Sequence, residues 1–276
     1  MLIVEKTITV TGVFGLLDVQ RKPDFSFNGE SHPFWEMVYV REGRVGVSAD
    51  GRIYNLSQGD AIFHKPGEFH RIWSAGDVGP KLYILTFEAQ GEGMKKFESL
   101  TIKPDERSVK LLERIVDRGK RGFEFERGYL MKGVVDERPA QEYVNYLEIF
   151  LLGISNADLA DTLPADSSAD SKLFFDAVAW LRKHIGEKVC IEDIAQAFYI
   201  SPSRIKKLFS RYTGMGVIEY FTHMKILEAQ KMLADGKPVS ETAEKLGFSN
   251  QFYFSTVFKK TSGVSPSEYR KNHFAE

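Results

Sequence analysis

Two stretches near the C-terminal end repeat one pattern, Ile191-Glu-Asp-Ile-Ala-Gln-Ala-Phe-Tyr-Ile-Ser-Pro-Ser-Arg-Ile-Lys-Lys-Leu-Phe-Ser-Arg-Tyr-Thr-Gly214 and Val239-Ser-Glu-Thr-Ala-Glu-Lys-Leu-Gly-Phe-Ser-Asn-Gln-Phe-Tyr-Phe-Ser-Thr-Val-Phe-Lys-Lys-Thr-Ser-Gly263. Each copy predicts a helix, a tight turn and a second helix, and their closing glycines are offset by 49 residues (263 − 214). Many proteins use this arrangement to place the second helix in the DNA major groove. Two copies on one chain suggest that one polypeptide reads two successive grooves.

Local signals predict where the helices of each copy begin and end. Ser201 is a favourable N-cap, and Pro202 suits the first helical position, where no backbone donor is needed. In the second copy the second helix is predicted over 250–260, and Gly247 fits a left-handed turn before it. A long helix over 218–234 joins the copies and is expected to set the angle between them.

The exposed faces of the two second helices differ in chemistry. The first carries small polar and long cationic side chains, which suit base edges and phosphates. The second carries amide, aromatic and hydroxyl groups, which suit adenine and thymine. We therefore predict that the two helices read different sequences. The predicted DNA contacts are Ser203, Arg204, Lys206, Lys207, Arg211, Asn250, Gln251, Tyr253, Thr256, Lys259 and Lys260.

The balance of charge changes along the chain. Residues 172–276 contain 16 Lys and Arg against 11 Asp and Glu, whereas residues 1–171 contain 21 against 27. A basic C-terminal region suits a polyanion such as DNA. The single cysteine, Cys190, excludes an internal disulfide and a cysteine-based zinc site. Without a signal peptide or a long apolar stretch, we expect a cytoplasmic protein with no membrane partner.

The sequence predicts an α+β protein of several domains. Residues 10–90 contain short β-branched and aromatic runs separated by turn signals, which are typical of an antiparallel sandwich or barrel. Two helices within 103–153 are expected to cover the barrel or to pair with a second subunit, completing a domain over 1–155. Small, polar and acidic residues at 156–171 predict a flexible linker, and residues 172–276 form an all-α domain.

The segment 174–273 resembles the DNA-binding domain of AraC/XylS-type transcription regulators. The resemblance is strongest in the run from Gly247 to Arg270 and includes Ile194-Ala195 and Ser201-Pro202-Ser203 of the first copy. It implies two helix-turn-helix units that enter the major groove about 34 Å apart on one DNA face. By position, it implies base reading by Ser203, Lys206, Lys207, Gln251, Tyr253 and Thr256.

The N-terminal region resembles a cupin barrel, through Glu36, Gly43, Gly59-Asp60 and the run Pro66-Gly-Glu-Phe-His70. Such a barrel often serves these regulators as effector sensor and dimerisation unit. Metal-binding cupins need a His-x-His pair, and Glu30-Ser-His32 stands in its place here. We predict no bound metal and no cofactor, but whether Glu30, His32, Glu36 and His70 bind a metal is left open. The predicted effector contacts are Glu30, His32, Trp35, Glu36, Phe63, His70, Arg71 and Trp73.

These features predict a sequence-specific DNA-binding transcription regulator, without catalytic residues, that responds to a small polar effector such as a sugar. Its expected partners are promoter DNA, the effector, a second copy of the chain and, for an activator, RNA polymerase. Two alternatives remain: a metal-dependent cupin enzyme with a helical interaction tail, and a DNA-binding dimer without an effector. The sequence identifies neither the effector nor the operator, nor whether the protein activates or represses.

Overall fold

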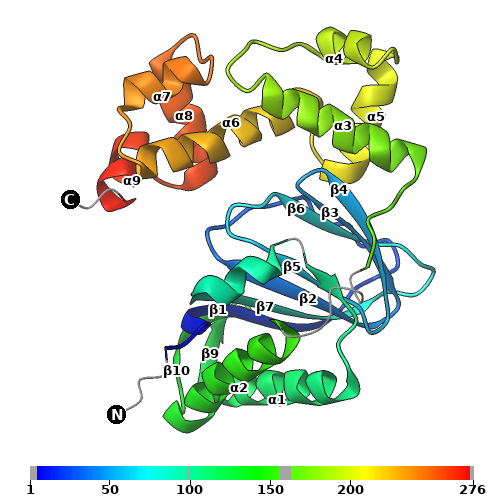
Figure 1. Ribbon diagram of the computed structural model, residues 1–276, viewed down its shortest axis with the longest axis vertical. Helices are drawn as coiled ribbons and strands as arrows, with labels where there is room; N and C mark the ends of the chain where they lie inside the picture. Colours follow the sequence, from blue (N-terminus) through cyan, green and yellow to red (C-terminus); the bar gives the residue numbers. More distant parts are fainter. Residues whose placement is uncertain (1–4, 99, 156–162, 274–276) are drawn as a thin grey trace. The chain divides into compact units, whose positions relative to one another are not determined.

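The computed structural model describes residues 5–98, 100–155 and 163–273. The chain divides into two compact units, Met1–Asp166 and Ser167–Glu276 (Figure 1). The first consists of β-sheets and two long helices, and the second is helical. The predicted α+β class, with an antiparallel β domain followed by a helical domain, is confirmed.

Two antiparallel sheets form the N-terminal unit. One has the strand order β8-β5-β2-β7-β1-β10-β9 and the other the order β4-β3-β6. The strands are β1 (Thr9–Gln20), β2 (Trp35–Glu42), β3 (Arg44–Ala49), β4 (Arg52–Ser57), β5 (Ala61–His64), β6 (His70–Ser74), β7 (Lys81–Gln90), β8 (Thr101–Ile102), β9 (Phe123–Glu126) and β10 (Leu130–Val134). A 3-10 helix, η1 (Glu92–Phe97), and two α-helices, α1 (Glu106–Gly122) and α2 (Glu137–Ser155), complete the unit.

The larger sheet has a buried apolar layer on each face, because successive side chains of a strand point to opposite sides. On β2, Met37 and Tyr39 pack in the layer shared with α1 and α2. Val38 and Val40 pack in the layer shared with the smaller sheet. The side chain of Glu36 therefore belongs to the side between the two sheets.

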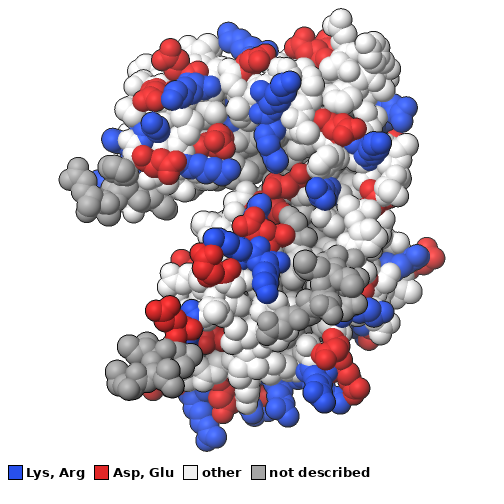
Figure 2. All heavy atoms as spheres, in the orientation of Figure 1, with Lys and Arg blue, Asp and Glu red and all other residues white. Residues whose placement is uncertain are grey.

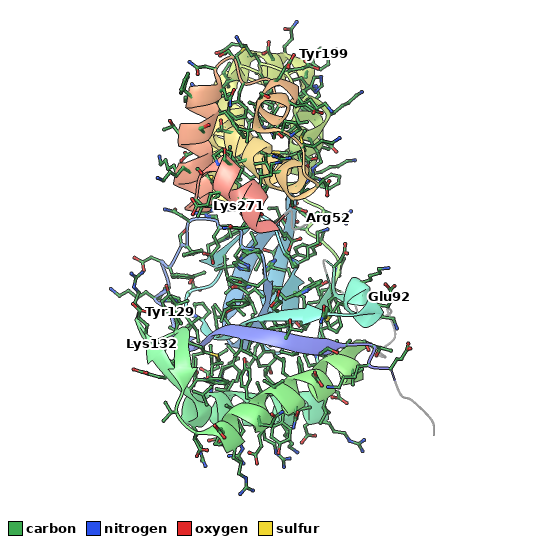
Figure 3. All side chains as sticks on the ribbon, turned by 90° about the vertical axis from the view of Figure 1, so that its left-hand side faces the viewer. Arg52, Glu92, Tyr129, Lys132, Tyr199 and Lys271 are labelled. Atoms are coloured by element: carbon green, nitrogen blue, oxygen red, sulfur yellow. The ribbon has the colours of Figure 1, made fainter. Side chains whose placement is uncertain are left out.

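The structure adds a hairpin that the sequence did not predict. Strands β9 and β10 pair between the two helices, and Tyr129 and Lys132 mark the hairpin in Figure 3. Its turn contains Arg127 and Gly128, both with positive φ. The two strands have only four and five residues, and β10 has mostly exposed side chains, so the alternation of Phe and Glu in β9 is too short to identify the hairpin.

The predicted linker over 156–171 is too long at its C-terminal end. Residues 156–162 lie outside the described residues. Beyond them, Leu163 and Ala165 pack against the apolar layer between the sheets, and the Leu163 amide donates to the carbonyl of Thr101 over 3.1 Å. The next helix, α3 (Ala169–Lys183), begins within the predicted linker because Ser168 caps its N-terminus.

The helical unit contains α3, α4 (Ile191–Ala197), α5 (Pro202–Thr213), α6 (Val217–Ala234), α7 (Val239–Lys245), α8 (Gln251–Ser262) and α9 (Pro266–His273). Helix α6 is the predicted long helix, and it joins the pair α4–α5 to the pair α7–α8 (Figure 1). Among the described residues, no helix is long and apolar enough to span a membrane.

The two tight turns have the same backbone structure. The amide of Tyr199 donates to Gln196 over 3.2 Å, and the amide of Gly247 donates to Glu244 over 2.9 Å. Both Tyr199 and Gly247 adopt positive φ, 53° and 68° respectively. The sequence repeat is therefore also a structural repeat, although the first copy has tyrosine where the second has glycine.

A buried lysine connects the second turn to the loop after α3. The ammonium of Lys225, on α6, donates to the carbonyls of Glu187, over 2.8 Å, and Leu246, over 2.7 Å. A Cβ atom on Gly247 would lie 2.2 Å from the carbonyl oxygen of Gly186. We call Gly186, Glu187, Lys225, Leu246 and Gly247 the junction, since they hold the second helix-turn-helix against the loop that precedes the first.

Candidate DNA-binding and effector sites

Helix α5 begins as the sequence predicted. The hydroxyl oxygen of Ser201 accepts a hydrogen bond from the amide of Arg204 over 3.2 Å. Ile205 and Phe209 are buried, which leaves Lys206 and Lys207 exposed on the opposite side. Within the described part of the chain neither lysine forms an ion pair, so both ammonium groups are available for phosphates or bases.

Two predicted contacts of α5 have a partner inside the protein. Nη2 of Arg204 lies 3.2 Å from Oδ1 of Asp170, and Nη1 of Arg211 lies 3.5 Å from Oδ2 of the same aspartate on α3. This pairing could not be predicted from the sequence, because Asp170 lies 34 residues before Arg204. The carboxylate offsets part of the positive charge of these two arginines.

Helix α8 presents amide, aromatic and methyl groups. Asn250 is its N-cap, and its Oδ1 accepts the amide of Phe252 over 2.7 Å. An oxygen used in this way does not form the bidentate contact with adenine, so that contact is left to Gln251 among the predicted amides. The hydroxyl of Thr256 donates to the carbonyl of Phe252 over 2.9 Å, and the methyl group of Thr256 remains for contact with thymine.

All predicted DNA contacts are exposed on α5 or α8, or at the N-cap of α8. Two further exposed aromatic residues were not among them. Phe252 is 85% exposed in the first turn of α8, and Tyr199 is 96% exposed in the first tight turn (Figure 3). The repeat could have indicated that Tyr199 lies in a tight turn, since it aligns with the turn residue Gly247. On the face seen in Figure 2, basic and acidic side chains are interspersed, so the positive charge of the helical unit is not concentrated there.

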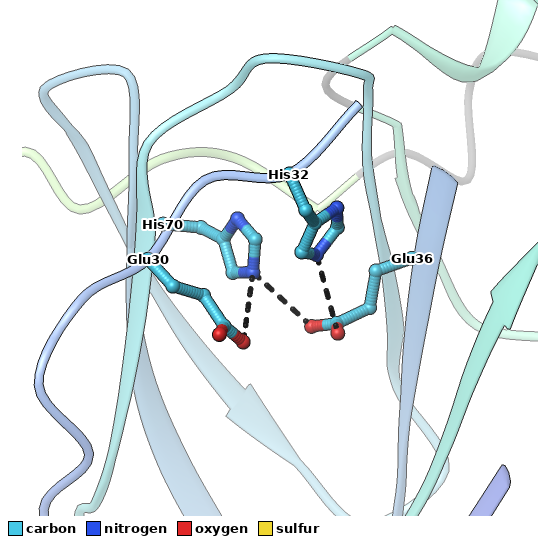
Figure 4. Close-up of side chains that lie close together, drawn as sticks. All are labelled: Glu30, His32, Glu36 and His70. Atoms are coloured by element: carbon cyan, nitrogen blue, oxygen red, sulfur yellow. Dashed lines mark ion pairs between the residues drawn. The ribbon is translucent and has the colours of Figure 1, made fainter. Parts of the chain in front are cut away.

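In the N-terminal unit, Glu30, His32, Glu36 and His70 converge on one point (Figure 4). Each offers one donor atom, and these atoms all lie within 4.8 Å of one another. Nε2 of His70 is 3.3 Å from Glu36 and 3.9 Å from Glu30, and Nε2 of His32 is 3.6 Å from Glu36. We call these four residues the His–Glu cluster.

Strand pairing and backbone hydrogen bonds position the His–Glu cluster. Glu36 belongs to β2, and His70 begins β6. The loop that carries Glu30 and His32 is held against β6, because Glu30 and His70 exchange two backbone hydrogen bonds of 2.9 Å each. Segments far apart in the sequence are thereby brought to one place.

The electrostatics of the His–Glu cluster arise from burial and mutual charge. Burial alone would raise the pKa of Glu36, but the charge of His70 and the nearby Nε2 atoms of both histidines hold that pKa well below its usual range. Burial disfavours the charged form of His70, yet the Glu36 carboxylate raises the pKa of His70 to about 9. Burial and the charge of Glu36 raise the pKa of Glu30. Glu36 is therefore an anion that needs positive charge beside it.

A second histidine–glutamate pair supports the His–Glu cluster. His64 lies opposite Glu36 in the pairing of β2 with β5, and its ring stacks on that of His70 with centroids 4.2 Å apart. Nδ1 of His64 lies 2.9 Å from a carboxylate oxygen of Glu68. Both residues are fully buried and fix the orientation of the His70 ring.

The structure does not bring the other predicted effector contacts to the His–Glu cluster. Trp35 and Phe63 lie in the apolar layer against α1 and α2, on the opposite face of the large sheet from Glu36. Arg71 donates to the carbonyl of Phe27 over 2.9 Å. Trp73 packs over Gly46, on the outer face of the small sheet. Adjacent residues of a strand point to opposite faces of its sheet. These four side chains therefore lie on the faces that point away from the space between the two sheets.

Both units match known protein families. Residues 17–94 match the family described as AraC-like ligand binding domain, and residues 194–272 match a helix-turn-helix domain family. The first match includes all of the His–Glu cluster, and the second includes α5 and α8.

Whole proteins and a solved structure are similar as well. The uncharacterized HTH-type transcriptional regulator YisR of Bacillus subtilis is 22% identical over 88% of this chain and 89% of its own. The arabinose operon regulatory protein of Salmonella typhimurium is 35% identical, but over only 34% of each chain. The C-terminal domain of AraT, a response regulator from Geobacillus stearothermophilus, is 30% identical with a TM-score of 0.38, over 40% of this chain and 92% of its own.

The fold, the two exposed recognition helices and the two family matches agree in their order along the chain. An antiparallel β unit with a ligand-binding match is followed by two helix-turn-helix units on one helical scaffold. The chain is an AraC-type DNA-binding transcription regulator with a ligand-binding domain.

Proposed function

We propose that α5 and α8 enter two successive major grooves of promoter DNA and read different half-sites. The observation that carries this proposal is the structural repeat: the same turn leads to an exposed helix in both copies. Lys206 and Lys207 on α5 would supply phosphate contacts and guanine reading. Gln251 and Thr256 on α8 would supply adenine and thymine reading.

Lys207→Ala is expected to weaken binding to a cognate promoter site by about tenfold, because a cation that contacts a base or phosphate is removed. Gel-shift titrations over a series of salt concentrations measure this change. The slope of log affinity against log salt should also become less steep by about one, if Lys207 contacts a phosphate.

Lys231→Ala is the matched control, because Lys231 is an exposed lysine on α6 that pairs with Glu228. Its affinity for the same DNA should match that of the wild type. Equal affinities and sequence preferences for Lys207→Ala and the wild type would remove Lys207 from the interface. Salt-insensitive binding by the wild type would argue against the docking as a whole.

For the N-terminal unit we propose a small polar effector, such as a sugar, bound near the His–Glu cluster. Carboxylates and imidazoles that converge at one place can hydrogen-bond the hydroxyl groups of such a molecule. The match to the arabinose regulator is too short to identify the effector. A thermal-shift screen of the full-length protein against sugars and small acids tests this, and no response to any of them would favour an effector-independent regulator.

We further propose that the protein is a cytoplasmic regulator rather than an enzyme. RNA polymerase would be its partner if it activates transcription.

We also propose that the protein works as a homodimer, and the exposed apolar side of helix α2 supports this. Its outward side exposes Ile149, at 54%, and Leu152, at 39%. A nearby groove of about 410 Å³ is lined in part by Val13, Val134 and Val144.

Ile149→Glu is expected to shift the protein from a dimer to a single chain of 31.4 kDa, because a carboxylate would have to be buried in the interface. Light scattering coupled to size-exclusion chromatography measures the mass. Ile218→Glu, at an exposed isoleucine of α6, is the control and should stay dimeric. A dimer that persists in Ile149→Glu would exclude this face as the interface.

A further inference from the structure

The His–Glu cluster presents two imidazole nitrogens and two carboxyl groups to a shared centre (Figure 4). We infer that Glu30, His32, Glu36 and His70 form a binding site for a divalent first-row transition metal ion, with zinc as the best match for this mixed set of donors. The inference goes beyond the proposed effector binding and does not depend on it, because it concerns the ion alone.

The hydrogen bonds of the two histidines leave the correct nitrogens for a metal. Nδ1 of His32 lies 2.9 Å from the carbonyl oxygen of Phe34, and Nδ1 of His70 lies 3.0 Å from that of Glu68. A carbonyl oxygen only accepts, so each Nδ1 carries the proton. Histidines that bind metals usually donate their other N–H to a backbone carbonyl or a carboxylate in this way.

Each Nε2 atom is buried and has no hydrogen-bond partner among the described residues. With both imidazoles neutral, each Nε2 would direct a lone pair at the Glu36 carboxylate, which also only accepts, so a proton on His70 takes this place when no ion is bound. Acceptors that face one another in a buried place need a cation between them. A metal ion would satisfy both nitrogens and the carboxylate at once.

The spacing of the donors fits an ion at their centre. A tetrahedral zinc ion with bonds of about 2.0–2.1 Å holds its ligand atoms about 3.4 Å apart. The three nitrogen–oxygen distances in the cluster are 3.3, 3.6 and 3.9 Å. Small side-chain movements would bring all four donors to bonding distance.

The surroundings hold the donors in place. The ring of His32 stacks on Phe34 with centroids 4.0 Å apart, and that of His70 stacks on His64. Glu36 and His70 are buried, whereas Glu30 is exposed, so an ion can enter from the side of Glu30. Such support for the ligands distinguishes a built site from a chance meeting of surface charges.

The test uses the full-length protein, freed of metal by a chelator and titrated calorimetrically with Zn²⁺. We expect one Zn²⁺ per chain, confirmed by elemental analysis after dialysis. Co²⁺ in place of Zn²⁺ should give the visible absorption of a nitrogen- and oxygen-ligated ion. His32→Ala and Glu36→Gln should each weaken Zn²⁺ binding by about tenfold or more. His184→Gln, which removes a histidine of the helical unit, should bind like the wild type.

Far-ultraviolet circular dichroism of the metal-free variants checks that each is folded. Glu36 is buried and its variant is the one at risk of misfolding, so His32→Ala, at a loop position, is the deciding variant. Absence of Zn²⁺ and Co²⁺ binding by the wild type would overturn the inference. Wild-type affinity in a folded His32→Ala protein would overturn it too. DNA binding in the presence of chelator is measured separately, so a failure here does not count against the proposed docking.

Discussion

Lys225→Met is expected to reduce the free energy of unfolding of the helical unit by about 2–4 kcal/mol, because two hydrogen bonds from a charged donor are lost. Methionine fills most of the volume but leaves the carbonyls of Glu187 and Leu246 without their donor. Burial lowers the pKa of Lys225 because it disfavours the charged ammonium group. The hydrogen bonds to the two carbonyls offset this cost and keep the ammonium in the junction. Urea unfolding of the full-length chain, followed by far-ultraviolet circular dichroism, measures the loss.

Lys231→Met provides the comparison, since Lys231 lies on the same helix with an exposed side chain. It should change the free energy of unfolding by no more than about 0.5 kcal/mol. Equal stabilities of the Lys225 and Lys231 variants would show that the ammonium at the junction contributes nothing to folding.

Gly247→Ala is expected to destabilise the helical unit by about 3 kcal/mol or more. A left-handed backbone costs a residue with a Cβ atom about 1–2 kcal/mol, and the new Cβ would also lie 2.2 Å from the carbonyl oxygen of Gly186. In the first copy, Tyr199→Gly should instead stabilise the helical unit by about 0.5 kcal/mol. The substitution removes the strain of tyrosine at positive φ, and this gain exceeds the entropy cost of ordering the more flexible glycine.

Thermal unfolding of both variants separates two explanations of the repeat. Opposite shifts in melting temperature would show that the turn needs a left-handed residue and that only the second copy needs it to be glycine. If Gly247→Ala melts like the wild type, the close approach to Gly186 does not limit stability.

The helical unit was predictable because its signals are local. The cap of α5 at Ser201 and the left-handed turn at Gly247 follow from a few neighbouring residues. Contacts between distant segments were not predictable. The pairing of Asp170 with Arg204 depends on how α3 packs against α5, which no periodicity shows.

The N-terminal site was predictable in part. The spacing of Glu30, His32 and Glu36 with the later His70 indicated residues that the structure brings together. The aromatic residues Trp35, Phe63 and Trp73 lie away from the His–Glu cluster because a strand alternates its faces, and the sequence did not show which face of β2 meets the helices. Trp35 is adjacent to Glu36 yet lies on the other side of the sheet. The orientation of the two histidine rings by the carbonyls of Phe34 and Glu68 could not be predicted either, because every residue type has the same backbone carbonyl.

The junction has a consequence for the operator. Because it fixes the second helix-turn-helix to the loop before the first, α5 and α8 cannot change their separation independently of α6. Each base pair added between the half-sites moves one of them about 3.4 Å along the DNA axis and turns it by about 34°. A protein docked as proposed would therefore accept one spacer length, and an operator with a single inserted base pair would keep only one of its two half-sites engaged.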